Sequence, residues 1–526
     1  MIISGGQNIE IPSHAHFGRY MLSNLRKANG NDVCLENGIT REKLTYKEAT
    51  QYAVNLSVGL SELGVKRGDV VAIGSEYFLH YVPTALAVTF TGAAYTTYEM
   101  GIGRAVLKHK LQLVKPKYFI SSVRFWQTFK DLLKSFDCIE TYIAVTDIPE
   151  LPYSLNSLIK VDVDVESFEP KEVQGNTDTV LILYSSGTTG MPKGVQMTHY
   201  SCIYNSLPDA FRQKPSLQTA FILVAIGNIV TFMTYKFLAL GRKVVFTTDF
   251  TQEKLLLLLK NNKIDVIFTL PNDIRQLALS VTPENDYFES VEMIYSRSAP
   301  LREHTIKQLQ EKLPKVKFII QAMGSTECGE PMSEIWAQKP KPGSVGVVSP
   351  GVQVKIVDVN TRKFLGPNQQ GEICVKGPMN MKSYIDIDRV DYLDEDGYYK
   401  TGDLGYFDEE HYFYIIDRLT DIIDVNGWKV SPVVLENILL QHPEVQDAGV
   451  IGKPDPMAVP TEYPMAFVVK KPGSQITERE LIEFVASEVT PYMQLKGGLR
   501  FIQEIPRNQR GKILRRQLKE MLCDSF

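Results

Sequence analysis

The sequence has no basic excess, no cysteine pair at metal-ligand spacing and no long apolar run. Its 57 Lys+Arg and 61 Asp+Glu give a net charge of −4, which argues against a nucleic-acid-binding protein. No apolar run approaches the ~20 residues of a membrane-spanning helix. The six cysteines are scattered without a CxxC pair, which favours a reduced, intracellular compartment and gives no sign of a zinc site.

Targeting signals are also missing from both ends of the sequence. The N-terminal segment has neither a basic region nor a long apolar core, so we expect no secretory signal. The last three residues, Asp524, Ser525 and Phe526, do not match a Ser-Lys-Leu peroxisomal signal. We therefore expect a soluble, cytoplasmic protein.

What the sequence does contain is a regular alternation of helical and strand patterns. Its 526 residues, 44% of them hydrophobic, are enough for two or more core-forming units. Helix and strand patterns alternate over residues 46–120 and again over 200–330, which is typical of layered α/β sheets. After residue 340, short strands with Gly/Pro turns predict a small antiparallel or barrel-like unit. The final part predicts a small, separate α+β domain.

A segment rich in glycine and hydroxyl groups, YSSGTTGMPKG at 184–194, directly follows the apolar run TVLIL. Its glycines let backbone N–H groups approach a ligand closely, and its hydroxyls and lysine add donors and charge. We predict a phosphate-binding loop; a flexible surface loop is the alternative. It is not a Walker loop, because Lys193 follows Pro192 and precedes Gly194. The residues predicted to bind phosphate are Ser185, Ser186, Gly187, Thr188, Thr189, Gly190 and Lys193.

SSGTTGMPKG resembles the [ST]SG[ST]TGxPKG signature of adenylate-forming enzymes. That superfamily includes acyl-CoA synthetases, 4-coumarate–CoA ligases, beetle luciferases and adenylation domains of peptide synthetases. The resemblance spans nearly the whole chain: QAMGSTE (321–327) is similar to QGYGxTE, TGD (401–403) is shared, and PRNQRGK (506–512) matches PxxxxGK. Other segments of the sequence look most similar to insect luciferases and luciferase-like acyl-CoA synthetases.

This resemblance implies a two-step reaction that uses ATP, Mg²⁺ and coenzyme A. The carboxylate of a small-molecule acid attacks the α-phosphate of ATP and releases pyrophosphate, and a thiol then displaces AMP from the acyl-adenylate. Charge gathers at phosphorus, so the first step needs cations and N–H donors there. The resemblance makes Glu327 the Mg²⁺ ligand. It assigns catalytic roles to Lys512, Thr326, Glu327 and Lys193.

The same resemblance assigns the nucleotide and thiol sites. Asp403 is expected to accept hydrogen bonds from the ribose hydroxyls, with Arg418 nearby, and Gly427 to approach the pantetheine of coenzyme A. Taken alone, each has a structural explanation: a turn for Asp403, a hairpin for Gly427 and a solvated lysine for Lys512. The segment expected beside adenine comprises Met323, Gly324, Ser325 and Thr326.

Two domains are implied, an AMP-binding (adenylation) domain at 1–417 and a mobile domain at 418–526. In the family that the chain resembles, the small domain rotates about an acidic residue that precedes an arginine. Here these residues are Asp417 and Arg418. One orientation brings Lys512 to the adenylation site, and the other brings the loop around Gly427 there. Turnover then depends on domain motion.

Several positions depart from the family pattern. The family's adenine-binding stretch reads G-G-A-P, and here Arg297 and Ser298 replace its two glycines. Met323 replaces an aromatic residue that stacks on adenine in the family. Both changes are expected to alter the affinity for ATP. No histidine occurs between His199 and His304, and 226–228 reads Ile-Gly-Asn where relatives have a histidine segment. Such a wall suits an aliphatic acid. Three nearby residues line this wall or belong to the core: Phe232, Met233 and Tyr235.

Luciferases and many ligases have lysines in the loop after the hinge, where this chain has Asp421, Asp424 and Asn426. The reversed charge argues against light-emitting chemistry. Our leading hypothesis is an acyl-CoA synthetase for a medium- or long-chain fatty acid. The alternatives are a luciferase-like monooxygenase and a catalytically weakened relative that binds nucleotide or acyl ligand. The sequence does not indicate the oligomeric state, and proteins of this type are often peroxisomal.

Overall fold

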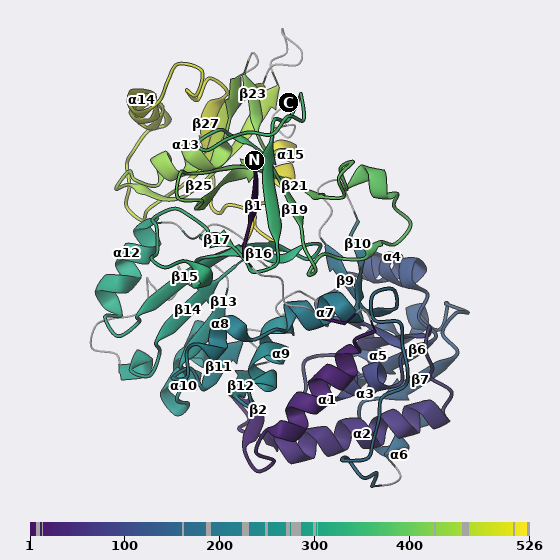
Figure 1. Cartoon of the computed structure of the whole chain (residues 1–526). Coiled ribbons are helices and arrows are strands. Elements are labelled where there is room, and N and C mark those ends of the chain that lie inside the picture. The colour runs from purple at the N-terminus through teal and green to yellow at the C-terminus, as the bar shows by residue number, and fades with distance from the viewer. Residues whose placement is uncertain are drawn as a thin grey trace.

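The structure is a computed structural model, and it describes most of the chain (Figure 1). The described residues are 1–6, 11–12, 14–159, 162–185, 191–222, 231–247, 251–269, 274, 286–297, 301, 303–425, 428–454, 462–508 and 511–522. The expected mixed α/β fold with a small C-terminal domain is confirmed. No helix among these residues is long and apolar enough to cross a membrane.

The first large sheet has eight strands, and its centre is parallel as the alternating pattern predicts. The antiparallel hairpin of β9 (Thr179–Ser185) and β10 (Lys193–Thr198), with the short antiparallel strand β20 (Ser383–Tyr384), extends one edge of it. Its strands run in the order β20 (Ser383–Tyr384), β10 (Lys193–Thr198), β9 (Thr179–Ser185), β5 (Ala94–Tyr98), β4 (Val70–Gly74), β6 (Tyr118–Ser121), β7 (Thr141–Ala144) and β8 (Tyr153–Ser154). The helices of this region are α2 (Tyr46–Glu62), α3 (Tyr81–Phe90), α4 (Arg104–Val114), α5 (Val123–Leu133) and α6 (Leu155–Leu158).

The second large sheet has nine strands, in the order β17 (Val347–Val348), β16 (Gly329–Ser333), β15 (Phe318–Ser325), β14 (Met293–Ser296), β13 (Val266–Thr269), β11 (Thr219–Ile222), β12 (Lys243–Phe246), β2 (Val33–Asn37) and β3 (Lys43–Thr45). Strands β15 to β2 in this order are parallel. The carboxyl ends of parallel strands therefore meet at one edge, where ligands of α/β proteins bind.

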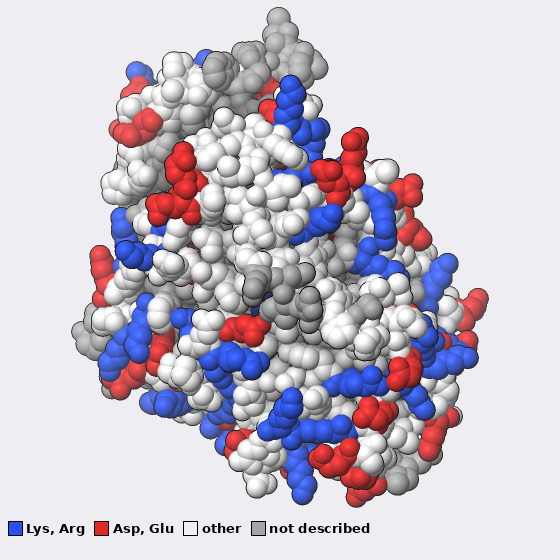
Figure 2. Space-filling model, viewed as in Figure 1, with Lys and Arg blue, Asp and Glu red and all other residues white. Residues whose placement is uncertain are grey.

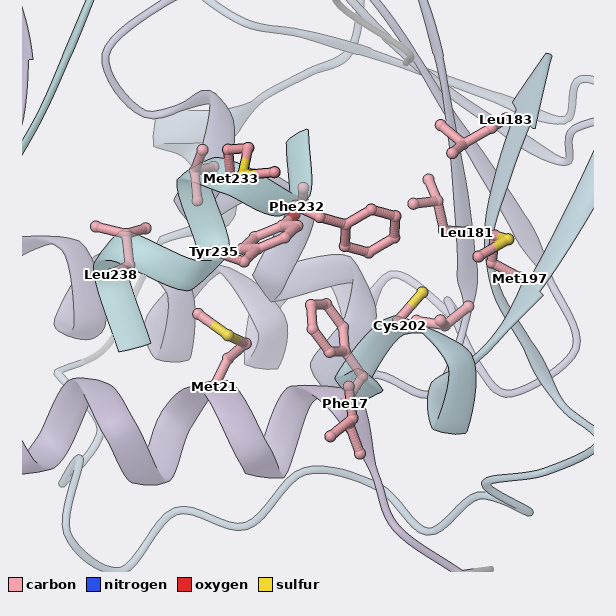
Figure 3. Close-up of a cluster of buried hydrophobic side chains, with 14 of the residues drawn as sticks. Phe17, Met21, Leu181, Leu183, Met197, Cys202, Phe232, Met233, Tyr235 and Leu238 are labelled. Atoms are coloured by element: carbon pink, nitrogen blue, oxygen red, sulfur yellow. The ribbon is translucent and has the colours of Figure 1, made fainter. Parts of the chain in front are cut away.

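The main hydrophobic core lies around helices α1 (Phe17–Lys27), α7 (His199–Asn205) and α9 (Thr231–Ala239). Tyr235 of α9 packs edge-on against Phe17 of α1, with ring centroids 5.1 Å apart, and Phe232 lies in the same cluster in Figure 3; all three are at most 2% exposed. The hydroxyls of Tyr235 and Tyr95 lie 2.9 Å apart. Of the two readings left open for Phe232, Met233 and Tyr235, the structure shows core packing. Other described helices near the nine-stranded sheet are α8 (Asp209–Arg212), α10 (Gln252–Asn261), α12 (Glu303–Lys312), η1 (Asp286–Phe288) and η2 (Glu334–Trp336).

A smaller antiparallel sheet follows, as the Gly/Pro-punctuated strands predict. Its order is β1 (Ile2–Ser4), β18 (Gln353–Val357), β19 (Gly371–Lys376), β21 (Tyr399–Phe407) and β22 (Phe413–Arg418). Strand β1, which no sequence pattern predicts, joins the N-terminal segment to β18 with Ile2 opposite Lys355. The short helix η3 (Arg389–Asp391) precedes β21.

The C-terminal part has its own hydrophobic cluster, which includes Leu435, Val450 and Leu481. Its elements are β23 (Ile423–Val425), β24 (Trp428–Val430), α13 (Pro432–Leu439), β25 (Val445–Pro454), β26 (Glu462–Lys470), α14 (Glu478–Glu488), β27 (Gly498–Phe501) and α15 (Arg515–Glu520). It lies at the top of Figure 1, beside the five-stranded sheet. Charged side chains of both signs are spread over the face of the molecule in Figure 2. The described cysteines form no disulfide.

Candidate active site

The glycine-rich segment lies between the two strands of the β9–β10 hairpin. Ser185 at the end of β9 pairs with Lys193 at the start of β10. The apolar run before the segment is the buried part of β9, so the strand fixes the residue after which the segment begins. Residues 186–190, which include most of the predicted phosphate ligands, lie outside the described residues, and their role stays a prediction.

Tyr384 connects Lys193 with Glu327. The Lys193 ammonium lies over the Tyr384 ring, 5.0 Å from its centroid, and the Tyr384 hydroxyl donates to Glu327 Oε1 at 2.6 Å. Burial and the neighbouring carboxylate raise the pKa of the Tyr384 phenol, so it remains a donor. Strand β20 places Tyr384 opposite Val195 of β10. Tyr384 was not among the predicted site residues, because no sequence motif marks a two-residue strand.

The turn after β15 positions the predicted adenine and magnesium residues. Ser325 Oγ accepts hydrogen bonds from the backbone N–H groups of Glu327 and Cys328, each at 3.3 Å. Thr326 and Glu327 are 5% and 6% exposed. A Cβ on Gly324 would overlap the carbonyl oxygen of Gly329, so glycine is required there. Met323 pairs with Met332 across the hairpin and is buried in the main core.

Arg297, the departure from the G-G-A-P pattern, lies directly behind this turn. Its Nε lies 3.4 Å from Glu330 Oε2, and both side chains are buried. Its Nη2 would be 2.6 Å from a Cβ on Gly324. Glu330 also accepts a hydrogen bond from Tyr295. The Arg297 side chain therefore occupies the space that the missing Cβ of Gly324 leaves open, and Glu330 is its counter-ion. Ser298 lies outside the described residues.

Asp403 and Arg418 are cross-strand partners in the β21–β22 pair. Arg418 Nε lies 2.8 Å from Asp403 Oδ1, and its Nη1 donates to the Thr401 carbonyl at 2.9 Å. Burial raises the pKa of the Asp403 carboxyl, and the Arg418 and Lys512 cations partly offset that rise. Asp403 is thus part of a strand and not of a simple turn, and Arg418 fixes one of its carboxylate oxygens.

Lys512 lies close to Asn508, in a segment that Arg507 links to β25. Asn508 Oδ1 accepts the Lys512 backbone N–H at 3.0 Å, and Arg507 Nη2 donates to the two carboxylate oxygens of Asp447 at 2.9 and 3.0 Å. The Lys512 ammonium, 3.9 Å from Asp421 Oδ2, belongs to a side chain that is 47% exposed. Removal from water lowers its pKa, as do Arg418 and Arg515, whereas Asp421 and Asp403 oppose that change.

These groups form one continuous cluster. Glu327 and Tyr399 act electrostatically on Arg418 together with Asp403, and the hydroxyls of Tyr399 and Tyr384 lie 3.4 Å apart. Segments that are far apart in the sequence thus bring three cations, two carboxylates and two phenols to one place. Among the described residues, no group of three or more His, Cys, Asp or Glu residues could hold a metal ion. A single carboxylate such as Glu327 fits Mg²⁺, which binds through one or two carboxylates plus substrate phosphates.

A family model described as AMP-binding enzyme matches residues 24–385, and one described as AMP-binding enzyme C-terminal domain matches residues 434–512. The chain belongs to the AMP-binding enzyme family. Luciferin 4-monooxygenase of Nipponoluciola cruciata is 32% identical over 512 residues, 94% of this chain and 92% of the relative. 4-Coumarate–CoA ligase 3 of Arabidopsis thaliana is 31% identical over 530 residues, 98% of this chain and 93% of the relative.

Solved structures of AMP-binding enzymes share the fold. ATP-bound MatB from Rhodopseudomonas palustris has a TM-score of 0.83 at 24% identity and covers 96% of this chain and 99% of its own. An anthranilate CoA ligase in complex with anthranoyl-AMP has a TM-score of 0.84 at 21% identity, with 98% and 99% covered. The expected enzyme class, an AMP-forming acid–thiol ligase, is confirmed for this AMP-binding enzyme.

Gly427, Asn426 and residues 226–228 of this AMP-binding enzyme lie outside the described residues. The expected approach of Gly427 to the pantetheine of coenzyme A and the expected acid-binding wall at residues 226–228 therefore stay predictions. Asp421 and Asp424 are described; Asp421 faces Lys512 and Arg515 at 3.9 and 3.8 Å. One further contact was not predicted: a ring nitrogen of His109 on α4 lies 2.9 Å from the Pro192 carbonyl, at the end of the glycine-rich segment.

Proposed function

We propose that this protein is an ATP-dependent acyl-CoA synthetase that converts an acid to an acyl-adenylate and transfers the acyl group to coenzyme A. The observation that carries the proposal is the cluster of Lys193, Glu327, Asp403, Arg418 and Lys512. It combines cations for a developing charge at phosphorus with carboxylates for a metal and a ribose, as adenylation requires.

Each residue has a role in this proposal. Lys193 and Lys512 stabilise the negative charge that develops on the α-phosphate, and Glu327 holds Mg²⁺ while the Tyr384 hydroxyl orients its carboxylate. Asp403 accepts hydrogen bonds from the ribose hydroxyls, because Arg418 fixes its carboxylate. Bound Mg²⁺ would supply charge neutralisation between the phosphates.

The proposed acid is a medium- or long-chain fatty acid. The support is the histidine-free, apolar sequence around residues 226–228, which suits an aliphatic chain better than a polar aromatic acid. The proposed division at Asp417, with domains 1–417 and 418–526, lets the small domain serve both steps. The Lys512 environment corresponds to the adenylation orientation, because Asp403 and Arg418 act on its ammonium.

The test measures pyrophosphate release and acyl-CoA formation over a panel of acids of increasing chain length, with ATP, Mg²⁺ and coenzyme A. We expect acid-dependent release with the highest kcat/KM for aliphatic acids of medium or long chain. No turnover with any acid would overturn the proposed function. Turnover restricted to aromatic acids would overturn only the substrate class.

A second candidate is a luciferase-like monooxygenase, and the similarity to luciferin 4-monooxygenases favours it. Asp421 and Asp424 oppose it, because they place negative charge where luciferases have lysines. A luminometer assay with luciferin, ATP and oxygen distinguishes the two, and we expect no light above background. The third candidate, a weakened relative that binds nucleotide or acyl ligand, predicts ATP binding without pyrophosphate release.

A further inference from the structure

The helix α13 is capped by a carboxylate from a different segment of the chain. Its N-cap residue, Ser431, makes no side-chain cap of its own. Instead Asp417 Oδ2 accepts hydrogen bonds from Ser431 Oγ at 2.8 Å and from the Val433 backbone N–H at 3.3 Å. Asp417 and Ser431 are 8% and 6% exposed. The carboxylate therefore satisfies a helix N–H that would otherwise lack a partner.

The bond between Asp417 and Ser431 crosses the proposed domain division. Asp417 lies on β22, within the five-stranded sheet, whereas Ser431 and α13 pack in the C-terminal part. A hydrogen bond to a buried, charged carboxylate is among the stronger ones, and the helix dipole adds to it. A rotation about Asp417 that moves α13 away from β22 must break both bonds. They therefore favour the orientation in which they form.

Helix α13 is linked in turn to the segment that carries Lys512. Glu436 on α13 accepts a hydrogen bond from Arg515 Nη1 at 2.8 Å and another from the Val450 backbone N–H at 2.9 Å. Glu436 and Arg515 have side chains that are only 3% and 12% exposed. Arg515 follows Lys512 by three residues, so a buried ion pair ties the position of Lys512 to that of α13.

We propose that Ser431 is a positioning residue for adenylation: its bond to Asp417 holds α13, and through Glu436 and Arg515 also Lys512, at the nucleotide site. The inference rests on the proposed function, because it assigns Lys512 to the first step. It goes beyond that function by naming the contact that favours the adenylation orientation. Loss of the Asp417–Ser431 hydrogen bond lets the small domain adopt other orientations. The rate of adenylation then falls, while the rate of thioester formation does not.

The kinetic test compares Ser431→Ala with the wild type in two half-reactions. We expect acid-dependent ATP–pyrophosphate exchange to fall about 10- to 100-fold, the amount that corresponds to one hydrogen bond to a charged group. Thioester formation from a pre-formed acyl-adenylate is expected to be unchanged or faster. Ser431→Thr keeps the hydroxyl and should restore exchange. Ser487→Ala is the matched control, because among the described residues Ser487 Oγ donates only to the Phe484 carbonyl within α14.

A second readout does not depend on activity. Hydrogen exchange followed by mass spectrometry is expected to show faster exchange in the peptide containing Val433 for Ser431→Ala, at an unchanged melting temperature. An equal fall in both half-reactions, or unchanged exchange at Val433, overturns the proposal. A wild type that shows no pyrophosphate exchange with any acid overturns the proposed function instead, and hydrogen exchange still decides whether Ser431 holds α13.

Discussion

The guanidinium of Arg297 and the carboxylate of Glu330 form a buried ion pair, with 3.4 Å between Nε and Oε2, directly behind Gly324. A buried pair contributes little compared with apolar residues of the same size, but removal of one partner leaves a charge without compensation. The pair therefore makes the fold sensitive to single substitutions at a position where the family pattern has glycine.

Glu330→Gln leaves Arg297 buried without its counter-charge. We expect the free energy of unfolding to fall by about 3 kcal/mol, measured by urea denaturation. The control is Glu483→Gln, which removes a carboxylate from an exposed pair with Arg479 and should change stability by at most about 0.5 kcal/mol. The double variant Arg297→Met/Glu330→Met should recover most of the loss. Equal stability of Glu330→Gln and the wild type would contradict the ion-pair argument.

Gly324→Ala introduces a methyl group for which there is no space. The Cβ would overlap the Gly329 carbonyl and press on Arg297, so the turn that carries Thr326 and Glu327 must shift. We expect adenylation to fall by at least about tenfold, because misplaced catalytic groups lose rate steeply. Gly366→Ala is the control, because no atom lies within 4 Å of its Cβ position. Normal ATP–pyrophosphate exchange in Gly324→Ala would show that the turn tolerates the methyl group.

Lys512→Ala removes the cation expected at the reacting phosphorus. We expect ATP–pyrophosphate exchange to fall by about 100-fold or more, while thioester formation from a supplied acyl-adenylate persists. Lys519→Ala removes a half-exposed lysine that pairs with Glu462 at 3.4 Å and serves as the control. If both half-reactions fell together, Lys512 would have a role in folding or in nucleotide binding generally.

His16 and His199 predict an acid-sensitive fold. Their rings lie 4.6 Å apart in the main core. Burial lowers the pKa of His16 to about 4 and that of His199 to about 3, from 6.5. As the pH falls below 6.5 the unfolded chain takes up protons first, so stability is complete above that pH and declines toward pH 4. At pH 5 the cost is about 2 kcal/mol per histidine.

The measurement is urea denaturation between pH 7.5 and 5, and His199→Asn is the informative variant. It removes one titrating group, so its stability should depend less steeply on pH than that of the wild type, whatever its stability at pH 7.5. Parallel pH dependences of the two proteins would show that other groups cause the acid sensitivity.

Local pattern predicted much of the fold. The apolar runs before the glycine-rich segment, at residues 266–269 and at 293–296 are strands in the large sheets, and the helical pattern from Tyr46 is α2. These elements follow from side-chain periodicity and turn residues, which act over a few positions. Strand β1 lacked such a signal, because three residues are too few for periodicity and its partner lies some 350 residues later.

Sequence patterns placed the candidate site by segment but not by contact. The motif residues Glu327, Asp403 and Lys512 were predicted, and the structure brings them into one cluster. The contacts between them depend on tertiary register: Tyr384 reaches Glu327 only because β20 pairs with β10, and Glu330 meets Arg297 only because β16 folds back on β15. No spacing in the sequence encodes either contact.

The pairing of β1 with β18 has a practical consequence for handling the protein. Strand β1 is the short edge strand of the five-stranded sheet and covers the longer strand β18, whose bare edge would offer more unpaired N–H and C=O groups to other molecules. Trimming the first few residues would uncover β18 and promote self-association in concentrated samples.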